Sequence, residues 1–329
     1  MLNSSEENEV YALELGLKRK EKKTSKYISM QEFKKEDYLQ FAEKHNYVVI
    51  EDTKIPLRRI WKIETFTPPK DYVSERETTW SFPDRGSWAT HIGDYRGNWS
   101  PYIPRNLILK YTEEGDTVLD QMVGSGTTLV ECKLLGRNGI GIDINPNALI
   151  VTYDRLNFEY RSQTGKCREP KIKVYLGDAR NLDKINDDSI DLVATHPPYA
   201  HIVSYSKSRV EGDLSALPFE EYVQEMGVVA KEAYRVLKPG KHCAILIGDT
   251  RKHKHYVPIA FRIMQKFLEA GFILREDIIK QQWKMKSTRE KWRKMEYDFY
   301  LITHEHLFVF RKPLRKEDLK KFKLSSAWW

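Results

Sequence analysis

Cysteine is scarce in this 329-residue chain, and its three cysteines are widely separated. Cys132, Cys167 and Cys243 form no Cys-x-x-Cys pair. This spacing argues against a disulfide framework or a zinc knuckle and favours a reducing cytosol. We therefore expect a cytoplasmic protein that is held together by an ordinary hydrophobic core.

Long apolar runs are also missing. No stretch approaches the ~20 apolar residues that a membrane-spanning helix needs. The first eight residues are polar and acidic and lack the apolar core of a secretory signal. The sequence predicts a globular protein with no membrane partner, built as one large domain with elaborations.

Basic residues exceed acidic ones by eight. This balance is typical of nucleic-acid binders, because phosphate contacts supply much of their affinity, although lysine-rich chains are common for other reasons. Basic clusters at 18–23 and in a basic tail at 313–329 are interpreted as solvated termini. A third cluster within 280–300 is interleaved with tryptophan, which can stack on bases and so favours nucleic-acid contacts. An edge helix that packs its tryptophans on the core would explain the same pattern equally well. The predicted nucleic-acid contacts are Lys280, Trp283, Lys284, Lys286, Arg289, Lys291, Trp292 and Arg293.

Strand and helix patterns divide the chain. Residues 1–85 show no clear alternation and form an N-terminal extension, with a helix expected within 29–46 and a linker over 67–86. Residues 86–312 alternate strands with helices, which predicts an α/β fold with a doubly wound, seven-stranded, mostly parallel sheet. We expect strands at 117–121, 138–142, 171–176, 190–195, 241–247, 272–280 and 304–311, and helices beginning near 127, 146, 219 and 257.

A glycine turn follows the first of these strands. Gly124 and Gly126 lie between Asp120 and Thr127, where the strand leads into a helix. Glycine is required where φ is positive or where the backbone must touch a ligand without an intervening Cβ. The turn falls at the carboxyl end of a strand, where open α/β sheets bind ligands. It matches neither a P-loop nor a dinucleotide fingerprint, and it indicates a site for a nucleoside cofactor.

Acidic residues end the next two strands as well. Asp143 follows the glycine turn by about twenty residues and is placed to bind two ribose hydroxyls. Asp178 ends the third strand and could accept a hydrogen bond from an adenine amino group. Each acid alone is more often a strand-end cap, but three on one sheet edge favour a cofactor site.

A Pro-Pro-aromatic loop, Thr195-His-Pro-Pro-Tyr199, follows the fourth strand. Pro197 and Pro198 fix the backbone and remove two N–H groups, which leaves carbonyl acceptors. A plain turn that closes the strand is the alternative, and the neighbouring glycine turn argues against it. The loop is suited to gripping a flat ring that carries an amino group.

Together these motifs resemble the S-adenosylmethionine-dependent DNA amino methyltransferases, which modify N6 of adenine or N4 of cytosine. The resemblance covers roughly residues 86–312 and implies a Rossmann-like methyltransferase fold. The family's Asp/Asn/Ser-Pro-Pro-Tyr/Phe tetrad is similar to His196, Pro197, Pro198 and Tyr199, which implies that these residues are catalytic.

The same resemblance implies S-adenosylmethionine as the cofactor. The segment 98–107 is similar to the family's segment before the first strand, which helps to hold the methionine end of the cofactor. The implied cofactor contacts are Trp99, Ser100, Pro101, Asp120, Met122, Gly124, Gly126, Thr127, Asp143, Ile144, Asp178, Ala179 and Thr195.

His196 departs from the family's tetrad, which begins with Asp, Asn or Ser. The lone pair of the target amine is delocalised into its ring, so catalysis needs acceptors that draw on the N–H bonds. A carbonyl of the proline pair supplies one acceptor, and a neutral His196 could supply another, whereas protonated imidazole only donates. If His196 is an acceptor, activity is expected to fall below roughly pH 6.5. The alternatives are that it only positions the loop or that the enzyme is inactive.

The implied substrate is double-stranded DNA, with Tyr199 stacked on a flipped base and a slight preference for cytosine N4. The gap between the two motifs is short, so recognition is expected from 1–85, 199–217 or 280–300. We expect the protein to belong to a restriction-modification or orphan modification system, with or without an endonuclease partner. We expect it to be a monomer or a weak dimer.

Other hypotheses stay open. An RNA or protein-amide amino methyltransferase could use the same loop, and an inactive nucleic-acid-binding subunit would explain His196, although its cofactor site is intact. No metal is predicted, because His253-x-His255 and His304-x-His306 have no evident carboxylate or cysteine partner. Asp249 could line the target pocket or cap a strand end.

Overall fold

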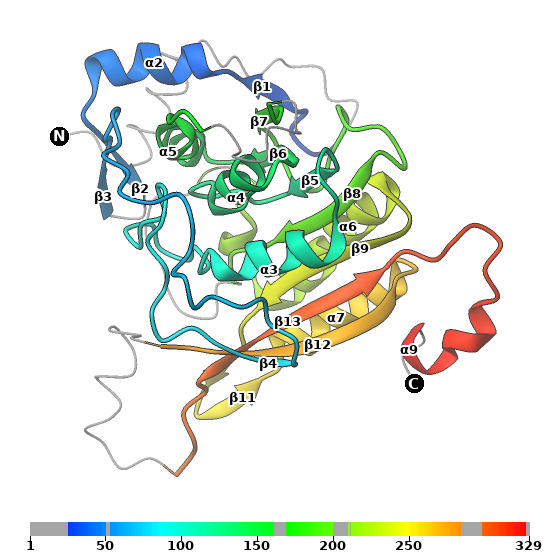
Figure 1. Ribbon diagram of the computed structural model, residues 1–329. Coiled ribbons are helices and arrows are strands. Elements are labelled where there is room, and N and C mark those ends of the chain that lie inside the picture. The colour runs from blue at the N-terminus through cyan, green and yellow to red at the C-terminus, as the bar shows by residue number, and fades with distance from the viewer. Residues whose placement is uncertain are drawn as a thin grey trace.

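The computed structural model describes residues 26–50, 53–160, 169–199, 210, 212–283 and 298–326. Within these ranges the centre of the protein is a nine-stranded sheet of order β1-β7-β6-β5-β8-β9-β13-β12-β4 (Figure 1). Its strands are β1 (Gln31–Phe33), β4 (Thr79–Ser81), β5 (Thr117–Asp120), β6 (Asn138–Asp143), β7 (Ile172–Leu176), β8 (Ile190–Thr195), β9 (Leu237–Ile247), β12 (Ile273–Gln281) and β13 (His304–Arg311).

The strand order reverses between β5 and β8. β5 pairs in parallel with β6 on one side and with β8 on the other, and the chain then continues outward in both directions. All six residues of β8 are buried, as expected for a central parallel strand covered on both faces. Such a reversal opens a crevice at the carboxyl ends of the two strands.

Helices cover both faces of the sheet (Figure 1). α3 (Tyr102–Tyr111), α4 (Thr127–Leu135) and α5 (Pro146–Leu156) lie on one face, and α6 (Phe219–Val236) and α7 (Ile259–Glu269) lie on the other. α7 shows why: Ile259, Ile263 and Phe267 recur at four-residue intervals and are all buried. The doubly wound α/β prediction and all seven predicted strands are confirmed. Among the described helices, none is long and apolar enough to cross a membrane.

The N-terminal extension supplies the two outermost strands, which sequence analysis did not predict. β1 pairs antiparallel with β7, and β4 pairs in parallel with β12. The helix expected within 29–46 is shorter, α2 (Lys35–Lys44), because residues 31–33 are taken up by β1. A small hairpin of β2 (Tyr47–Ile50) and β3 (Thr53–Pro56) follows.

The extension packs into the main core. Phe33, Tyr38 and Phe41 are buried in one cluster with side chains of α4, α5 and β7. The carboxylate of Asp154 on α5 accepts hydrogen bonds from Tyr38 Oη at 2.8 Å and from the Arg58 amide at 3.0 Å. Residues 26–50 and 53–85 are therefore part of the methyltransferase-like unit in space.

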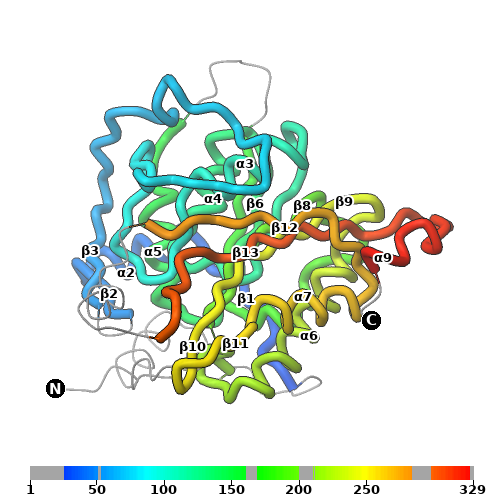
Figure 2. The backbone as a smooth tube through the Cα atoms, turned by 90° about the horizontal axis from the view of Figure 1, so that it is seen from below, coloured from blue at the N-terminus to red at the C-terminus, as the bar shows by residue number. Residues whose placement is uncertain are grey.

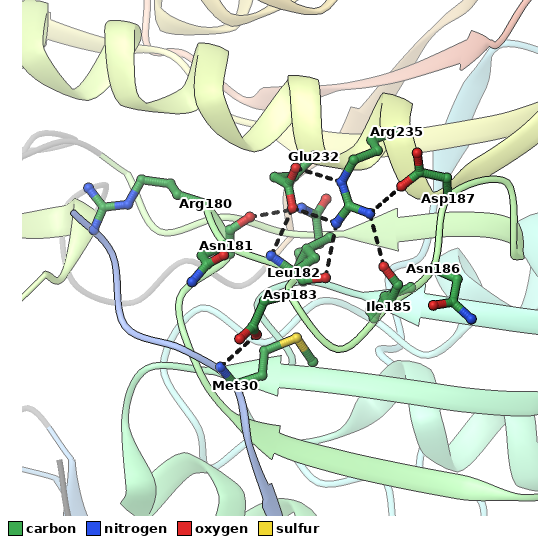
Figure 3. A network of polar contacts seen from close by, with 12 residues as sticks. Met30, Arg180, Asn181, Leu182, Asp183, Ile185, Asn186, Asp187, Glu232 and Arg235 are labelled. Atoms are coloured by element: carbon green, nitrogen blue, oxygen red, sulfur yellow. Dashed lines mark hydrogen bonds and ion pairs between the residues drawn. The ribbon is translucent and has the colours of Figure 1, made fainter. Parts of the chain in front are cut away.

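A polar network fixes the loop between β7 and β8 to α6 (Figure 3). Arg235 donates to the carbonyl oxygens of Leu182 and Ile185, both at 2.9 Å. Glu232, which pairs with Arg235, accepts the Leu182 amide at 2.8 Å. This network holds the loop whose first residues include Asp178.

A second hairpin, β10 (Thr250–Lys252) and β11 (His255–Val257), follows β9 at the carboxyl edge of the sheet. It projects beside the chain that leads into β13 in both views (Figures 1 and 2). Its two turn residues, His253 and Lys254, have φ of 50° and 69°. The helix expected near 257 begins at Ile259 because this hairpin occupies 257. The helix of the C-terminal region is α9 (Lys323–Ser326), after the turn η2 (Leu319–Phe322).

Candidate active site

Asp120 links the glycine turn to the end of β8, at the point where the strand order reverses. It is buried at the end of β5 and accepts hydrogen bonds from Thr128 Oγ1 at 2.5 Å and Thr195 Oγ1 at 2.9 Å. Burial raises the pKa of Asp120 to about 6, against the lowering effect of these hydrogen bonds. Asp120 therefore fixes the spacing of two loops, a role that the cofactor assignment alone did not predict.

The glycine turn adopts the conformation that its sequence predicts. Gly124 and Gly126 have φ of +52° and +81°, the left-handed region that favours glycine. The Gly124 amide donates to Asp143 Oδ2 at 2.9 Å, so the turn is held against the end of β6. A Cβ at Gly126 would lie 3.0 Å from the Thr152 side chain, which leaves no room for a larger residue.

The two remaining acids differ in how much hydrogen-bonding capacity they keep. Asp143 accepts one backbone N–H at each oxygen, from Gly124 and Asn145, both at 2.9 Å. Burial raises the pKa of Asp143 to about 6. Asp178 instead is clamped by its neighbour Arg180, whose guanidinium binds both carboxylate oxygens, at 2.6 and 2.8 Å. Because a carboxylate has about four acceptor positions, Asp143 retains more capacity for a ligand than Asp178.

One cavity of about 750 Å³ brings the two motifs together. Residues of the glycine turn, the three strand ends and the Pro-Pro-Tyr loop all line it. Of the predicted cofactor contacts, the lining includes Trp99, Ser100, Asp120, Met122, Gly124, Thr127, Asp143, Ile144, Asp178 and Ala179. Pro101, Gly126 and Thr195 are not among the lining residues, and Thr195 contacts the lining through its hydrogen bond to Asp120.

The segment before α3 is fixed to the cavity wall by arginine, which sequence analysis missed. Arg85 donates to the carbonyl oxygens of Trp99 at 2.8 Å and Asn98 at 3.2 Å. Burial lowers the pKa of Arg85 to about 10. Farther along, the buried carboxylate of Glu131 on α4 binds Trp88 and His91, each at 2.7 Å. Arg85 and Glu131 form hydrogen bonds to groups that are distant in sequence. Their roles could therefore have been predicted only from the fact that these charged side chains are partly or fully buried.

The Pro-Pro-Tyr loop is anchored by helix α6. Pro197 is buried and Pro198 is exposed, and the Pro198 carbonyl accepts a hydrogen bond from Tyr222 of α6 at 2.8 Å. One carbonyl of the proline pair, that of Pro198, thus already accepts a hydrogen bond that holds the loop. All four predicted catalytic residues line the cavity.

His196 lies in an apolar setting that changes its expected titration. Its ring stacks on Trp99 with centroids 6.0 Å apart. Burial lowers the pKa of His196 to about 4, although Glu305 and the Gly97 backbone act in the opposite direction. The expected loss of activity below pH 6.5 assumed an unperturbed histidine, and the lowered pKa of His196 moves that expectation to a lower pH.

Glu305 on β13 is a site residue that sequence analysis missed. Its carboxylate accepts a hydrogen bond from Tyr199 Oη at 2.6 Å. It also forms an ion pair with Lys280 Nζ at 2.7 Å. Tyr199 Oη also lies 3.2 Å from His196 Nε2. A charged residue near the start of an apolar strand is buried only when it is paired, but the sequence does not show that the distant Tyr199 and Lys280 are its partners.

The predicted nucleic-acid segment is only partly described. Lys280 lies in the cavity and is ion-paired, so it is not a freely exposed contact. Trp283 is half exposed at the cavity wall and donates to Ser81 Oγ at 3.1 Å. The predicted contacts Lys284, Lys286, Arg289, Lys291, Trp292 and Arg293 lie outside the described residues.

Asp249 does not line the cavity. Its buried carboxylate accepts the Ala260 amide in the first turn of α7 at 2.7 Å, as well as the Tyr256 hydroxyl. Asp249 thus caps the start of α7, which neither of the two interpretations, a pocket residue or a strand-end cap, had predicted. No group of three potential metal ligands is found within the described ranges.

The reversed strand order, the glycine turn and the Pro-Pro-Tyr loop in one cavity define a Rossmann-like methyltransferase domain. The chain belongs to the DNA methylase family, whose model matches residues 6–153 and 190–326. The resemblance inferred from the motifs is thereby confirmed.

Several curated proteins are similar to this chain. The type II methyltransferase M.MjaII of Methanocaldococcus jannaschii is 31% identical over 184 residues, 53% of this chain and 31% of that protein. M.HpaI of Haemophilus parainfluenzae is 29% identical over 36% of this chain and 40% of that protein. A tRNA (guanine(10)-N2)-dimethyltransferase of M. jannaschii is 33% identical over 39% of this chain and 35% of that protein. The chain thus matches less than half the length of each of these relatives.

Proposed function

We propose that this protein transfers a methyl group from S-adenosylmethionine to the exocyclic amine of a base in DNA. The observation that carries the proposal is the single cavity shared by the glycine turn and the Pro-Pro-Tyr loop. Family membership supports the reaction class, and two of the similar proteins are type II methyltransferases. The finer proposals are duplex DNA as the substrate and a slight preference for cytosine N4 over adenine N6.

The cavity suits S-adenosylmethionine chemically. The volume of about 750 Å³ lies within the range of small-molecule sites. Gln121 Oε1 and Thr127 Oγ1 are buried at its wall and have no hydrogen-bond partner within the described ranges, so both can bind a polar ligand. Asp143 would bind the ribose hydroxyls, and the acidic lining favours a cation.

S-adenosylmethionine would supply an electrophilic methyl group: the amine lone pair would form the new N–C bond, the S–C electron pair would stay on sulfur, and one amine proton would pass to solvent. The residues of this chain position the amine and draw on its N–H bonds. Pro197, Pro198 and His196 lie at the acceptor side, and Tyr199 would contact the face of a base flipped out of the duplex.

An RNA substrate is the second candidate, and one similar protein is a tRNA methyltransferase. The basic composition supports either nucleic acid equally. We propose further that residues 280–300 contribute DNA contacts, and that the protein acts as a monomer or weak dimer within a restriction-modification or orphan modification system.

The test is methyl transfer from labelled S-adenosylmethionine to duplex DNA, single-stranded DNA and RNA, with mass spectrometry of the nucleosides. We expect N4-methylcytosine or N6-methyladenine in duplex DNA. Tyr199→Ala should abolish transfer while cofactor binding is retained, and Asp143→Ala should weaken cofactor binding. Transfer to RNA alone would promote the second candidate. Cofactor binding without transfer to any nucleic acid would contradict the proposal and favour an inactive subunit or a protein substrate.

A further inference from the structure

We propose that Glu305 is a positioning residue that holds Tyr199 and, through its hydroxyl, fixes the tautomer of His196 with the proton on Nε2. The functional consequence of this inference rests on the proposed methyl transfer, but the tautomer itself can be tested without any activity. Glu305 belongs to β13, far in sequence from the Pro-Pro-Tyr loop.

Burial and charge make the Glu305 carboxylate a constant acceptor. Its side chain is 8% exposed and lines the cavity, and Lys280 faces it from the paired position on β12. Burial alone would raise the pKa of Glu305, but Lys280, His196 and Tyr199 together lower it to about 2. The carboxylate is therefore ionised at every pH at which the protein would act.

Hydrogen-bond chemistry then determines where each proton lies. An ionised carboxylate only accepts, so Tyr199 Oη must donate its single proton to Glu305 across their 2.6 Å contact. The Tyr199 oxygen can then only accept from His196 Nε2, which lies 3.2 Å away. A neutral imidazole has one N–H, so the Nε2–H tautomer leaves the lone pair on Nδ1.

The other side of the ring is consistent with this assignment. Nδ1 of His196 is buried and has no hydrogen-bond partner of good geometry in the described part of the chain, although the Gly97 backbone acts on the ring and competes for its N–H. Nδ1 is therefore the one acceptor that the ring can offer in place of the oxygen of Asp, Asn or Ser. The pair Glu305–Tyr199 thus explains how a histidine can serve at this position as an acceptor.

A purely structural role is the competing account, because Lys280 and Glu305 are cross-strand neighbours and their ion pair links β12 to β13. That account predicts that loss of the carboxylate lowers stability and leaves the tautomer unchanged. The positioning role predicts the opposite pattern, because a Gln side chain can donate to the Tyr199 oxygen and free its hydroxyl to donate to His196.

The first experiment is nitrogen NMR of histidine-labelled full-length protein, with the His196 signals assigned from a His196→Gln variant. We expect Nε2–H in the native protein and a shift toward Nδ1–H in Glu305→Gln. Asp277→Asn is the matched control, because Asp277 binds His306 Nδ1 on the same strand pair at 3.0 Å, away from the cavity. An Nδ1–H His196 in the native protein, or an unchanged tautomer in Glu305→Gln, would overturn the inference.

The second experiment is a double-mutant cycle on methyl transfer with Glu305→Gln and Tyr199→Phe. We expect Glu305→Gln to lower kcat at least about tenfold, part of the 10²–10⁴-fold that a positioned proton acceptor typically contributes, with KM for the cofactor unchanged. In the Tyr199→Phe background the same change should have little further effect, because the residues act as one unit. Independent, additive effects would contradict the positioning role. A native protein that shows the expected tautomer but no transfer would refute the proposed function alone.

Discussion

At the scale of single residues, the site differs from its family pattern at His196, and its surroundings explain how it can remain neutral. Trp99 covers the ring and Glu305 lies beyond Tyr199. Burial costs the imidazolium more than the neighbouring carboxylate returns, so the pKa of His196 is lowered to about 4.

The first prediction concerns the pH dependence of kcat. With saturating cofactor and DNA, we expect no loss of kcat attributable to His196 between pH 8 and about 5, because a group with a pKa near 4 stays neutral there. The fall should begin only as the pH approaches 4. Initial rates in overlapping buffers measure this, and a midpoint near pH 6.5 that disappears in His196→Ser would contradict it.

The second prediction concerns Asp143 and cofactor affinity. Its pKa is raised to about 6, and only the ionised form offers full acceptor capacity to ribose hydroxyls. As the pH falls through 6, a proton therefore competes with the ligand, and the affinity should weaken by at most about tenfold per pH unit.

Isothermal titration with S-adenosylmethionine from pH 5 to 8 measures this effect. Asp143→Asn should bind more weakly at all values and lose the dependence. A dependence that persists in that variant would assign it to Asp120, which titrates in the same range.

At the scale of elements, the predictable parts of the fold were those whose signal is local. β5 and β8 were predicted because apolar runs end there at turn residues, and α6 because its apolar residues recur with helical spacing. β1 and β4 were missed because a three-residue strand carries no periodicity of its own and exists only through its long-range partner. The roles of Arg85 and Glu305 were missed for the same reason, because their partners are distant in sequence.

The third prediction concerns the hairpin β10–β11 as a phosphate-binding element. Lys252, His253, Lys254 and His255 are exposed and project from the sheet edge that carries the Pro-Pro-Tyr loop. Arg251 fixes the hairpin by donating to the Lys254 and Tyr300 carbonyls, both at 2.9 Å. The ion pair of Lys254 with Asp298 at 3.3 Å is exposed on both sides and can be exchanged for phosphate.

Replacing Lys252 and Lys254 by Ala should weaken DNA binding by roughly tenfold per lost contact at about 0.1 M salt and flatten the salt dependence accordingly. kcat at saturating DNA should be unchanged. Lys320→Ala with Lys321→Ala, on η2, is the matched control and should leave binding as it is. Equal losses in both double variants would indicate a general charge effect in place of a hairpin contact.

At the scale of the whole molecule, the described N-terminal residues pack against the sheet as one structural unit. Strands from residues 26–85 form both edges of the sheet. One apolar cluster also joins α2 to α4, α5 and β7. The boundary predicted at residue 85 reflects a change in the sequence pattern. The side chains on its two sides nevertheless pack together in one core.

The last prediction tests this unity through Phe33, which is fully buried between β1 and the core and packs against Tyr153 with ring centroids 5.7 Å apart. Phe33→Ala should lower the free energy of unfolding by about 3–5 kcal/mol, because the cavity that it leaves cannot collapse fully in a packed core. Leu39→Ala on α2 is the matched control, because Leu39 is 42% exposed and its loss should cost no more than about 0.5 kcal/mol. Urea unfolding followed by tryptophan fluorescence and by circular dichroism should give one coincident transition for each variant. If Phe33→Ala instead produced a separate early transition and left the main one in place, the extension would be an independent unit docked on the sheet. A single transition shifted as a whole requires that the edge strands and the cavity-bearing core fold together.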